Sequence, residues 1–234
     1  MSTLARVLAG AQHILLDFDG PVCAVFGGTS DRAVADELRA LLADRLGELP
    51  ADVADSPDPF EILRHAATLG PQITAETEHA FADLEREAVT SATETPGARE
   101  AITALHHAGR TITITSNNGV RAILAYLNTS GLAPLIDGVI GRADPSPALL
   151  KPDPHLVLQA VRARRAQPAE CALIGDSETD VRAAQAARVA AIAYANKPGK
   201  YDQLTATSPD AIITAMHEIT AAIAPRGPRN SRTG

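Results

Sequence analysis

The chain is poor in several residue types, and each shortage excludes a class of protein. Trp is absent and aromatic residues make up 3% of the 234 positions, which disfavours a ligand site built on base stacking. The two cysteines, Cys23 and Cys171, lack CxxC spacing, so neither a zinc site nor a disulfide framework is indicated. No apolar run approaches the roughly 20 residues of a membrane span. The stretch 4–8 is too short for a secretory signal and is broken by Arg6, so we expect a cytoplasmic protein without a membrane partner.

A basic surface is also missing. The formal net charge is −7 and no basic stripe is visible, which argues against a nucleic-acid partner. The acidic excess lies in one segment: residues 22–95 hold 15 acidic residues against 5 arginines and no lysine, a net charge of −10, whereas the remaining 13 acidic and 16 basic residues give +3. Most of these carboxylates are typical of solvated helix faces, but the imbalance disfavours a highly phosphorylated ligand.

Residues from about 30 to 93 show an almost wholly helical pattern. Ser30 or Asp31 can cap a first helix that ends at Gly47, and Asp58 can cap a second whose first residue is Pro59. The apolar spacing then predicts a third helix from Thr74 to about Val89. This segment is therefore expected to be all-helical.

From residue 98 onward, helical and strand patterns alternate. After a first strand at 13–16, we expect strands at 111–115, 138–140, 172–174, 189–193 and 211–213, with helices between them that include 98–108 and 119–130. Such alternation predicts an α/β fold, a doubly wound parallel sheet with helices on both faces. We divide the chain into a core (1–21 and 96–224), a helical insertion (22–95) and a tail (225–234) whose Pro, Gly, Arg and Ser content predicts disorder.

Polar side chains follow three of the expected strands and begin one helix. They are Asp17, Asp19, Ser116, Asn117, Lys151, Asp176 and Asp180. The carboxyl ends of parallel strands form one crevice, so these groups are expected to converge. Carboxylates brought together need a compensating cation or proton. Several carboxylates, a hydroxyl and an ammonium suit a hard divalent cation together with a phosphate.

These motifs resemble the haloacid dehalogenase superfamily, in the subgroup with a helical cap inserted after the first motif. The matching stretches are Asp17-Phe18-Asp19-Gly20, Thr115-Ser116-Asn117, Lys151-Pro152, and Gly175-Asp176-Ser177 with Asp180. The match spans about residues 13–195, and it implies a Rossmann-like core. Pro21 stands where threonine is usual, and Arg188 replaces a glycine, so we expect the helix before it to end without its usual left-handed glycine.

The resemblance also implies roles. Asp17 would be the nucleophile that forms an aspartyl-phosphate, and Asp19 would protonate the leaving group and then activate water. Mg²⁺ would be held by the Asp17 carboxylate, the Asp19 backbone carbonyl and Asp176, with Asp180 as an orienting group or further ligand. The phosphate would be bound by Ser116, Lys151 and the backbone amides near Phe18 and Asn117.

The resemblance therefore implies a Mg²⁺-dependent phosphomonoester hydrolase acting on a small phosphorylated metabolite, as a monomer or homodimer, with hinges at 22–28 and 94–97. Dehalogenation is disfavoured by Asp19, because a leaving halide needs no proton. Phosphonate cleavage is disfavoured because it uses a cap lysine to form a Schiff base, and residues 22–95 contain no lysine. A sugar phosphomutase stays open, and would hold a second phosphate with Arg32, Arg39, Arg45, Arg64 or Arg86. A non-catalytic phosphoester-binding protein is the alternative from another class.

Overall fold

The computed structural model describes residues 2–143 and 146–223, so the expected disorder of the tail 225–234 lies outside the described residues. Its centre is a six-stranded sheet of order β5-β4-β1-β6-β7-β8, in which every neighbouring pair is parallel. The expected Rossmann-like α/β core is thereby confirmed. The strands are β1 (His13–Leu16), β4 (Thr111–Gly119), β5 (Gly138–Arg142), β6 (Cys171–Gly175), β7 (Ala190–Tyr194) and β8 (Ala211–Ile213).

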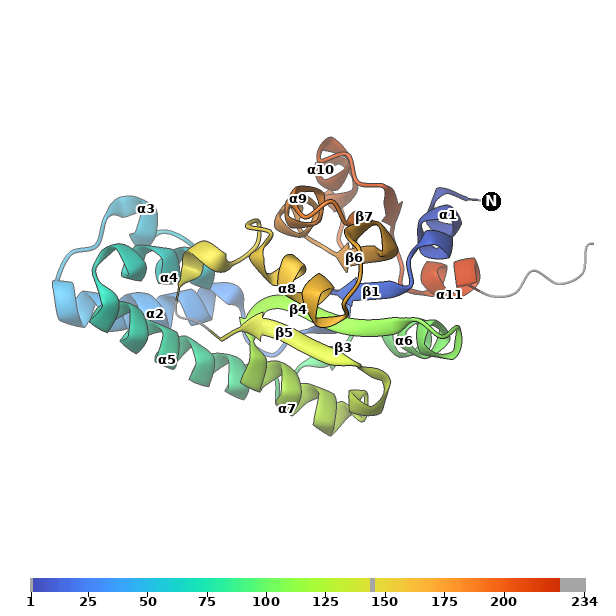
Figure 1. Ribbon diagram of the computed structural model, residues 1–234. Coiled ribbons are helices and arrows are strands. Elements are labelled where there is room, and N and C mark those ends of the chain that lie inside the picture. The colour runs from blue at the N-terminus through green and yellow to red at the C-terminus, as the bar shows by residue number, and fades with distance from the viewer. Residues whose placement is uncertain (1, 144–145, 224–234) are drawn as a thin grey trace, which may run out of the picture.

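Helices cover both faces of this sheet (Figure 1). One face carries α8 (His155–Ala163), α9 (Glu178–Ala186) and α10 (Lys200–Ala206), and the other carries α1 (Thr3–Gly10), α6 (Ala98–His107), α7 (Val120–Ser130) and α11 (His217–Ile223). Strand β1 explains the arrangement, because Leu15 packs into one apolar cluster while Ile14 and Leu16 pack into the other. Alternate side chains of a strand point to opposite faces, so a run that is apolar throughout needs cover on both. Among the described helices, none has the length and apolarity to cross a bilayer.

The segment between β1 and α6 forms a group of helices beside one end of the sheet (Figure 1). They are α2 (Asp31–Leu46), α3 (Ala51–Ala54), α4 (Pro59–Thr68) and α5 (Pro71–Ala88). Where the chain leaves and re-enters the sheet domain, β2 (Cys23–Ala24) pairs antiparallel with β3 (Thr93–Glu94). Strands of two residues are too short to be predicted from periodicity.

The helix starts follow the caps for the most part. The Ser30 hydroxyl accepts a hydrogen bond from the backbone of Ala33 at α2, and the Asp58 carboxylate accepts one from Phe60 at α4. The expected start of the third helix at Thr74 was wrong: α5 begins at Pro71, because proline suits the first helical position and needs no hydrogen bond there. Strand β4 also runs past the expected end at Thr115, with an irregular register before Gly119.

Helix α9 ends without a left-handed glycine, as expected. Arg188 itself adopts the left-handed conformation, with φ of 59°, in place of the glycine that is usual there. Its amide bonds to the carbonyl of Gln185 and the next amide, of Val189, bonds to Ala184, which satisfies the helix end. A non-glycine residue in this region costs roughly 1–2 kcal/mol.

Candidate active site

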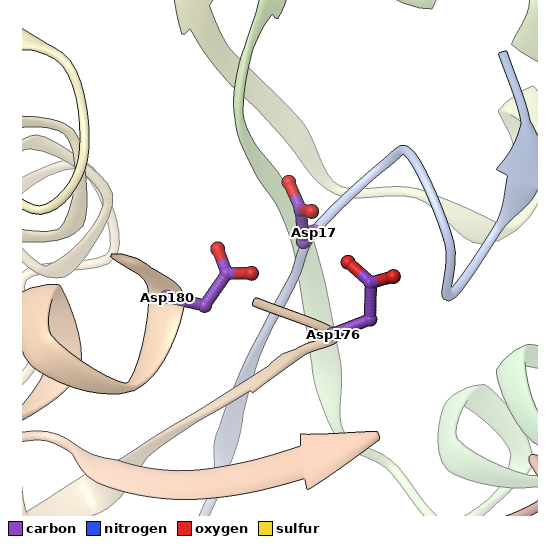
Figure 2. A group of neighbouring side chains, drawn as sticks. All are labelled: Asp17, Asp176 and Asp180. Atoms are coloured by element: carbon purple, nitrogen blue, oxygen red, sulfur yellow. The ribbon is translucent and has the colours of Figure 1, made fainter. Parts of the chain in front are cut away.

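Three carboxylates meet at the carboxyl ends of the central strands. Asp17 follows β1, Asp176 follows the neighbouring strand β6, and Asp180 lies in the first turn of α9. Figure 2 shows their carboxylates turned toward one another, and one oxygen from each lies within 4.8 Å of the others. Carboxylate oxygens at this spacing can ligate one hard divalent cation. The donor set therefore fits the metal that the sequence predicted.

Two glycines make room for these carboxylates. A Cβ atom on Gly20 would lie 2.5 Å from Cγ of Asp176, and one on Gly175 would collide with the side chain of Asp180. Gly20 also has a φ of 102°, a backbone conformation that residues with a side chain rarely adopt. Both glycines are therefore required by the close approach of the acidic side chains.

Lys151 is the cation buried among these acids. Its Nζ atom donates to Oδ1 of Asp17 at 2.8 Å, to Oδ1 of Asp180 and to the carbonyl of Thr115 at 3.1 Å, and the side chain is 2% exposed. Burial lowers the pKa of Lys151, but Asp17 and Asp180 raise it by more, so the ammonium stays charged. Burial and then the charge of Asp180 raise the pKa of Asp17 to about 7, against the pull of Lys151. Lys151 thus neutralises only part of the charge of the three carboxylates.

Asp19 lies beside the three carboxylates but is held differently. Its Oδ1 atom accepts a hydrogen bond of 2.8 Å from the backbone of Val25, and the side chain is not part of the three-carboxylate group among the described residues. Burial raises the pKa of Asp19 to about 6, although the Val25 bond opposes the rise and the charge of Asp176 adds to it. A carboxyl of this pKa can both give and take a proton near neutral pH.

The last residues of β4 are tied to the backbone of Lys151. Asn117 exchanges two hydrogen bonds with the backbone of Lys151, of 2.8 and 3.1 Å. The hydroxyl of Ser116, which is 1% exposed, donates to Oδ1 of Asn118 at 3.0 Å. The ring of Phe18 points away into the core and packs edge-on against Tyr126.

These groups surround one cavity of about 190 Å³. Its lining includes every site residue predicted from the sequence except Phe18: Asp17, Asp19, Ser116, Asn117, Lys151, Asp176 and Asp180. The helical segment contributes Asp58, Phe60 and Arg64 to the lining. The structure therefore brings together stretches that lie far apart in the sequence.

The model of the haloacid dehalogenase-like hydrolase family matches residues 11–188, which include every residue that lines the cavity. The chain belongs to this family.

Curated relatives match over a shorter stretch. The chain is 32% identical to a phosphoglycolate phosphatase of Nitrosospira multiformis over 130 residues, 55% of this chain and 56% of the relative. It is 27% identical to a phosphoglycolate phosphatase of Vibrio vulnificus over 124 residues, 53% of this chain and 54% of the relative. The chain thus spans about half the length of the curated relatives it matches.

Solved structures are similar over most of the chain. CbbY from Rhodobacter sphaeroides, in complex with phosphate, superposes with a TM-score of 0.65 at 16% identity, over 91% of this chain and 99% of that one. A HAD-superfamily hydrolase of subfamily IA from Geobacter sulfurreducens gives a TM-score of 0.59 at 20% identity, over 92% and 97%. At these identities the likeness concerns the fold.

Several residues at the site of this haloacid dehalogenase-like protein were not predicted. Asn196 and Lys200 donate to Oδ2 of Asp176 at 2.8 and 2.5 Å, and the lysine also reaches the Asp176 carbonyl at 2.9 Å. Lys200 begins a short helix after Gly199 and carries no motif that marks it. Asp58 was expected only as a helix cap, and Arg64 only as one of five arginines that could hold a second phosphate; the folded arrangement places both at the cavity.

Proposed function

We propose that this protein is a Mg²⁺-dependent phosphomonoester hydrolase that acts on a small phosphorylated metabolite through an aspartyl-phosphate. The observation that carries the proposal is the cavity in which Asp17 lies among two further carboxylates and the Lys151 ammonium. Family membership and the phosphatase relatives support the same chemistry. The activity rests on this convergence of acidic groups, a cation and a hydroxyl.

Asp17 is the proposed nucleophile. One of its oxygens attacks phosphorus, the bond from phosphorus to the leaving oxygen breaks, and water later cleaves the acyl phosphate to regenerate the carboxylate. Lys151, Ser116 and the backbone amides near Phe18 and Asn117 hold the non-bridging oxygens. For this, the Lys151 ammonium shifts part of its bonding from Asp17 and Asp180 to the phosphate.

Asp19 is the proposed acid and base. It protonates the leaving alkoxide and then takes a proton from the hydrolytic water, an effect worth roughly 10²–10⁴ in rate. The raised pKa of about 6 suits both steps, since a fraction of the carboxyl is protonated near neutral pH. The hydrogen bond from Val25 holds the Asp19 carboxyl at the cavity that Asp17 also lines.

Asp17, Asp176 and Asp180, with the backbone carbonyl of Asp19, are the proposed ligands of Mg²⁺. The bound cation would lower the repulsion between the Asp17 carboxylate and an anionic phosphate, and would make phosphorus more electrophilic. The ammonium of Lys200, which is 25% exposed, pairs with the Asp176 carboxylate at 2.5 Å.

The helical segment 22–95 is the proposed cap that closes over the substrate and excludes water. A cavity of about 190 Å³ suits a substrate of a few carbons. Arg64 lines it, while Arg39, Arg45 and Arg86 pair within the helical segment, so a phosphomutase would hold its second phosphate with Arg64. Phosphoglycolate, named for two relatives, is small and carries a carboxylate that Arg64 could bind, so it is the first substrate to test.

The test is phosphate release from a generic aryl phosphate and a panel of phosphorylated metabolites that includes phosphoglycolate, with Mg²⁺ and with chelator. The proposal predicts turnover that needs Mg²⁺ and is lost in Asp17→Asn. Inertness toward every phosphoester in the panel, in protein that still binds phosphate, would favour a non-catalytic binding protein instead.

A further inference from the structure

The most deeply buried ion pairs outside the cavity join the cap segment to the sheet. Arg142, the last residue of β5, has no exposed side-chain surface. Its Nε atom donates to both carboxylate oxygens of Glu78 at 2.8 Å, and its Nη2 atom donates to Glu85 at 2.6 Å. Both glutamates belong to α5, which packs against α7 and β4 (Figure 1). Burial lowers the pKa of Arg142, but Glu85 and Glu78 raise it by more, so the guanidinium stays charged.

Glu85 differs from Glu78 in what else it touches. Its Oε1 atom accepts a hydrogen bond of 3.0 Å from the side-chain amide of Asn118, and its Oε2 atom accepts one of 3.1 Å from the backbone of Gly119. The Glu85 side chain is fully buried, whereas that of Glu78 is 19% exposed and bonds to Arg142. One cap carboxylate thus reaches residues 116–119, the irregular last part of β4, hereafter the loop 116–119, which contains the proposed phosphate ligands Ser116 and Asn117.

The contact continues from Asn118 to Ser116. The Asn118 amide group donates to Glu85, so its oxygen faces the Ser116 hydroxyl, which donates to it at 3.0 Å. An asparagine side chain can lie either way round, and the Glu85 carboxylate, which only accepts, selects this orientation. Arg142 adds a hydrogen bond of 2.7 Å from Nη1 to the carbonyl of Asn117. The loop is therefore fixed by groups that are themselves fixed by Glu85.

We propose that Glu85 is a positioning residue, which holds the loop 116–119 ready for phosphate through Asn118, Gly119 and Arg142. Phosphate affinity then depends on a cap side chain that does not touch the phosphate, because the loop keeps its shape only while α5 is docked. The proposal rests on the proposed function for the role of Ser116 and Asn117. It assigns to the cap a part in binding the transferred group, in addition to closing over the substrate.

The variant Glu85→Gln tests this. Glutamine keeps the size of the side chain but replaces one acceptor oxygen with a donor, which would face the donors of Arg142, Asn118 or Gly119. The matched control is Glu78→Gln, which weakens the same guanidinium pair but leaves the bonds to Asn118 and Gly119 in place. Two quantities are measured with Mg²⁺ present: the Kd of inorganic phosphate by calorimetry, and kcat and KM for an aryl phosphate.

We expect Glu85→Gln to raise the Kd of phosphate and to lower kcat/KM, each by about 10- to 100-fold, as for other groups that orient a ligand. Glu78→Gln should change both by less than about threefold. In a Ser116→Ala background, Glu85→Gln should change the Kd of phosphate and kcat/KM by less than about threefold, because Glu85 acts on phosphate through Ser116. If Glu85→Gln does not fold, Gly119→Ala serves instead, since its Cβ would lie 2.9 Å from Oε2 of Glu85.

The proposal is overturned if Glu85→Gln matches Glu78→Gln, or if it loses the same factor with and without Ser116. The two proposals fail separately. If the wild-type protein turns over aryl phosphate and Glu85→Gln keeps full phosphate affinity, the proposed function is supported and the role of Glu85 is refuted. If the wild-type protein binds phosphate without turnover and Glu85→Gln weakens that binding, the role of Glu85 is supported and the proposed function is refuted.

Discussion

Replacing Lys151 by methionine should destabilise the protein in a way that depends on both pH and metal. The ammonium is 2% exposed and neutralises part of the charge of Asp17 and Asp180. Methionine keeps the aliphatic stem and removes the charge. Removing one partner of a buried ion pair costs about 3–5 kcal/mol, because the other charge stays buried without compensation. Asp17 can relieve part of this by taking a proton, so we expect ~3 kcal/mol at about pH 8 in chelator.

The sign of the pH dependence follows from the same groups. The folded-state pKa of Asp17 is about 7, above the ordinary value for an aspartate of about 4, and loss of the lysine raises it further. The folded protein then binds more protons than the unfolded chain above about pH 4, so the stability of the variant falls as the pH rises. Mg²⁺ should restore part of it, since a bound cation replaces the missing charge.

The assay is urea unfolding at about pH 5.5 and pH 8, in chelator and in excess Mg²⁺. Lys200→Met is the matched control, because Lys200 pairs with Asp176 of the same cluster but is 25% exposed. Solvent weakens that pair, so we expect its loss to cost about 1 kcal/mol or less. A cost for Lys151→Met below about 1 kcal/mol at both pH values, or equal to that of the control, would refute the reasoning.

Three further predictions concern the helix end, the metal and the substrate. Arg188→Gly should raise the free energy of unfolding by about 0.5–1 kcal/mol in urea titrations, because glycine relieves the strain of the left-handed conformation. The gain is smaller than the strain, since glycine also has more conformational entropy in the unfolded chain. An unchanged or lower free energy of unfolding would contradict this. The calorimetric Kd of Mg²⁺ should be about tenfold weaker at pH 6 than at pH 8, because protons compete for Asp17, whose pKa burial raises to about 7; equal values would remove Asp17 from the ligand set. Arg64→Ala should raise KM for phosphoglycolate about tenfold and leave KM for an aryl phosphate unchanged; equal changes for both would remove Arg64 as the carboxylate ligand.

The sheet and the strand-end residues could be predicted because local signals determine them. An apolar run such as 13–16 needs cover on both faces, and parallel strands bring Asp17 and Asp176 to the same edge whatever the detail of the loops. Caps such as Ser30 and Asp58 act within one helical turn, so they too can be read from neighbouring residues.

The rest depends on contacts between distant segments. Glu85 has the spacing of an ordinary helix residue, and only the docking of α5 against β4 and β5 makes it a ligand of Asn118 and Arg142. Arg142 lies at the end of an expected strand that was placed too short, at 138–140. The left-handed conformation of Arg188 could not be predicted from the sequence either, because arginine does not favour that backbone and the helix that precedes it packs against β7.

The central claim is that Asp17 takes up the phosphoryl group. During steady turnover with Mg²⁺, acid quenching followed by borohydride reduction converts an acyl phosphate into the corresponding alcohol, which peptide mass spectrometry can locate. The account predicts homoserine at position 17, absent in chelator and in Asp17→Asn. Full phosphate release by Asp17→Asn, or reduction at another residue while position 17 stays aspartate, would contradict it.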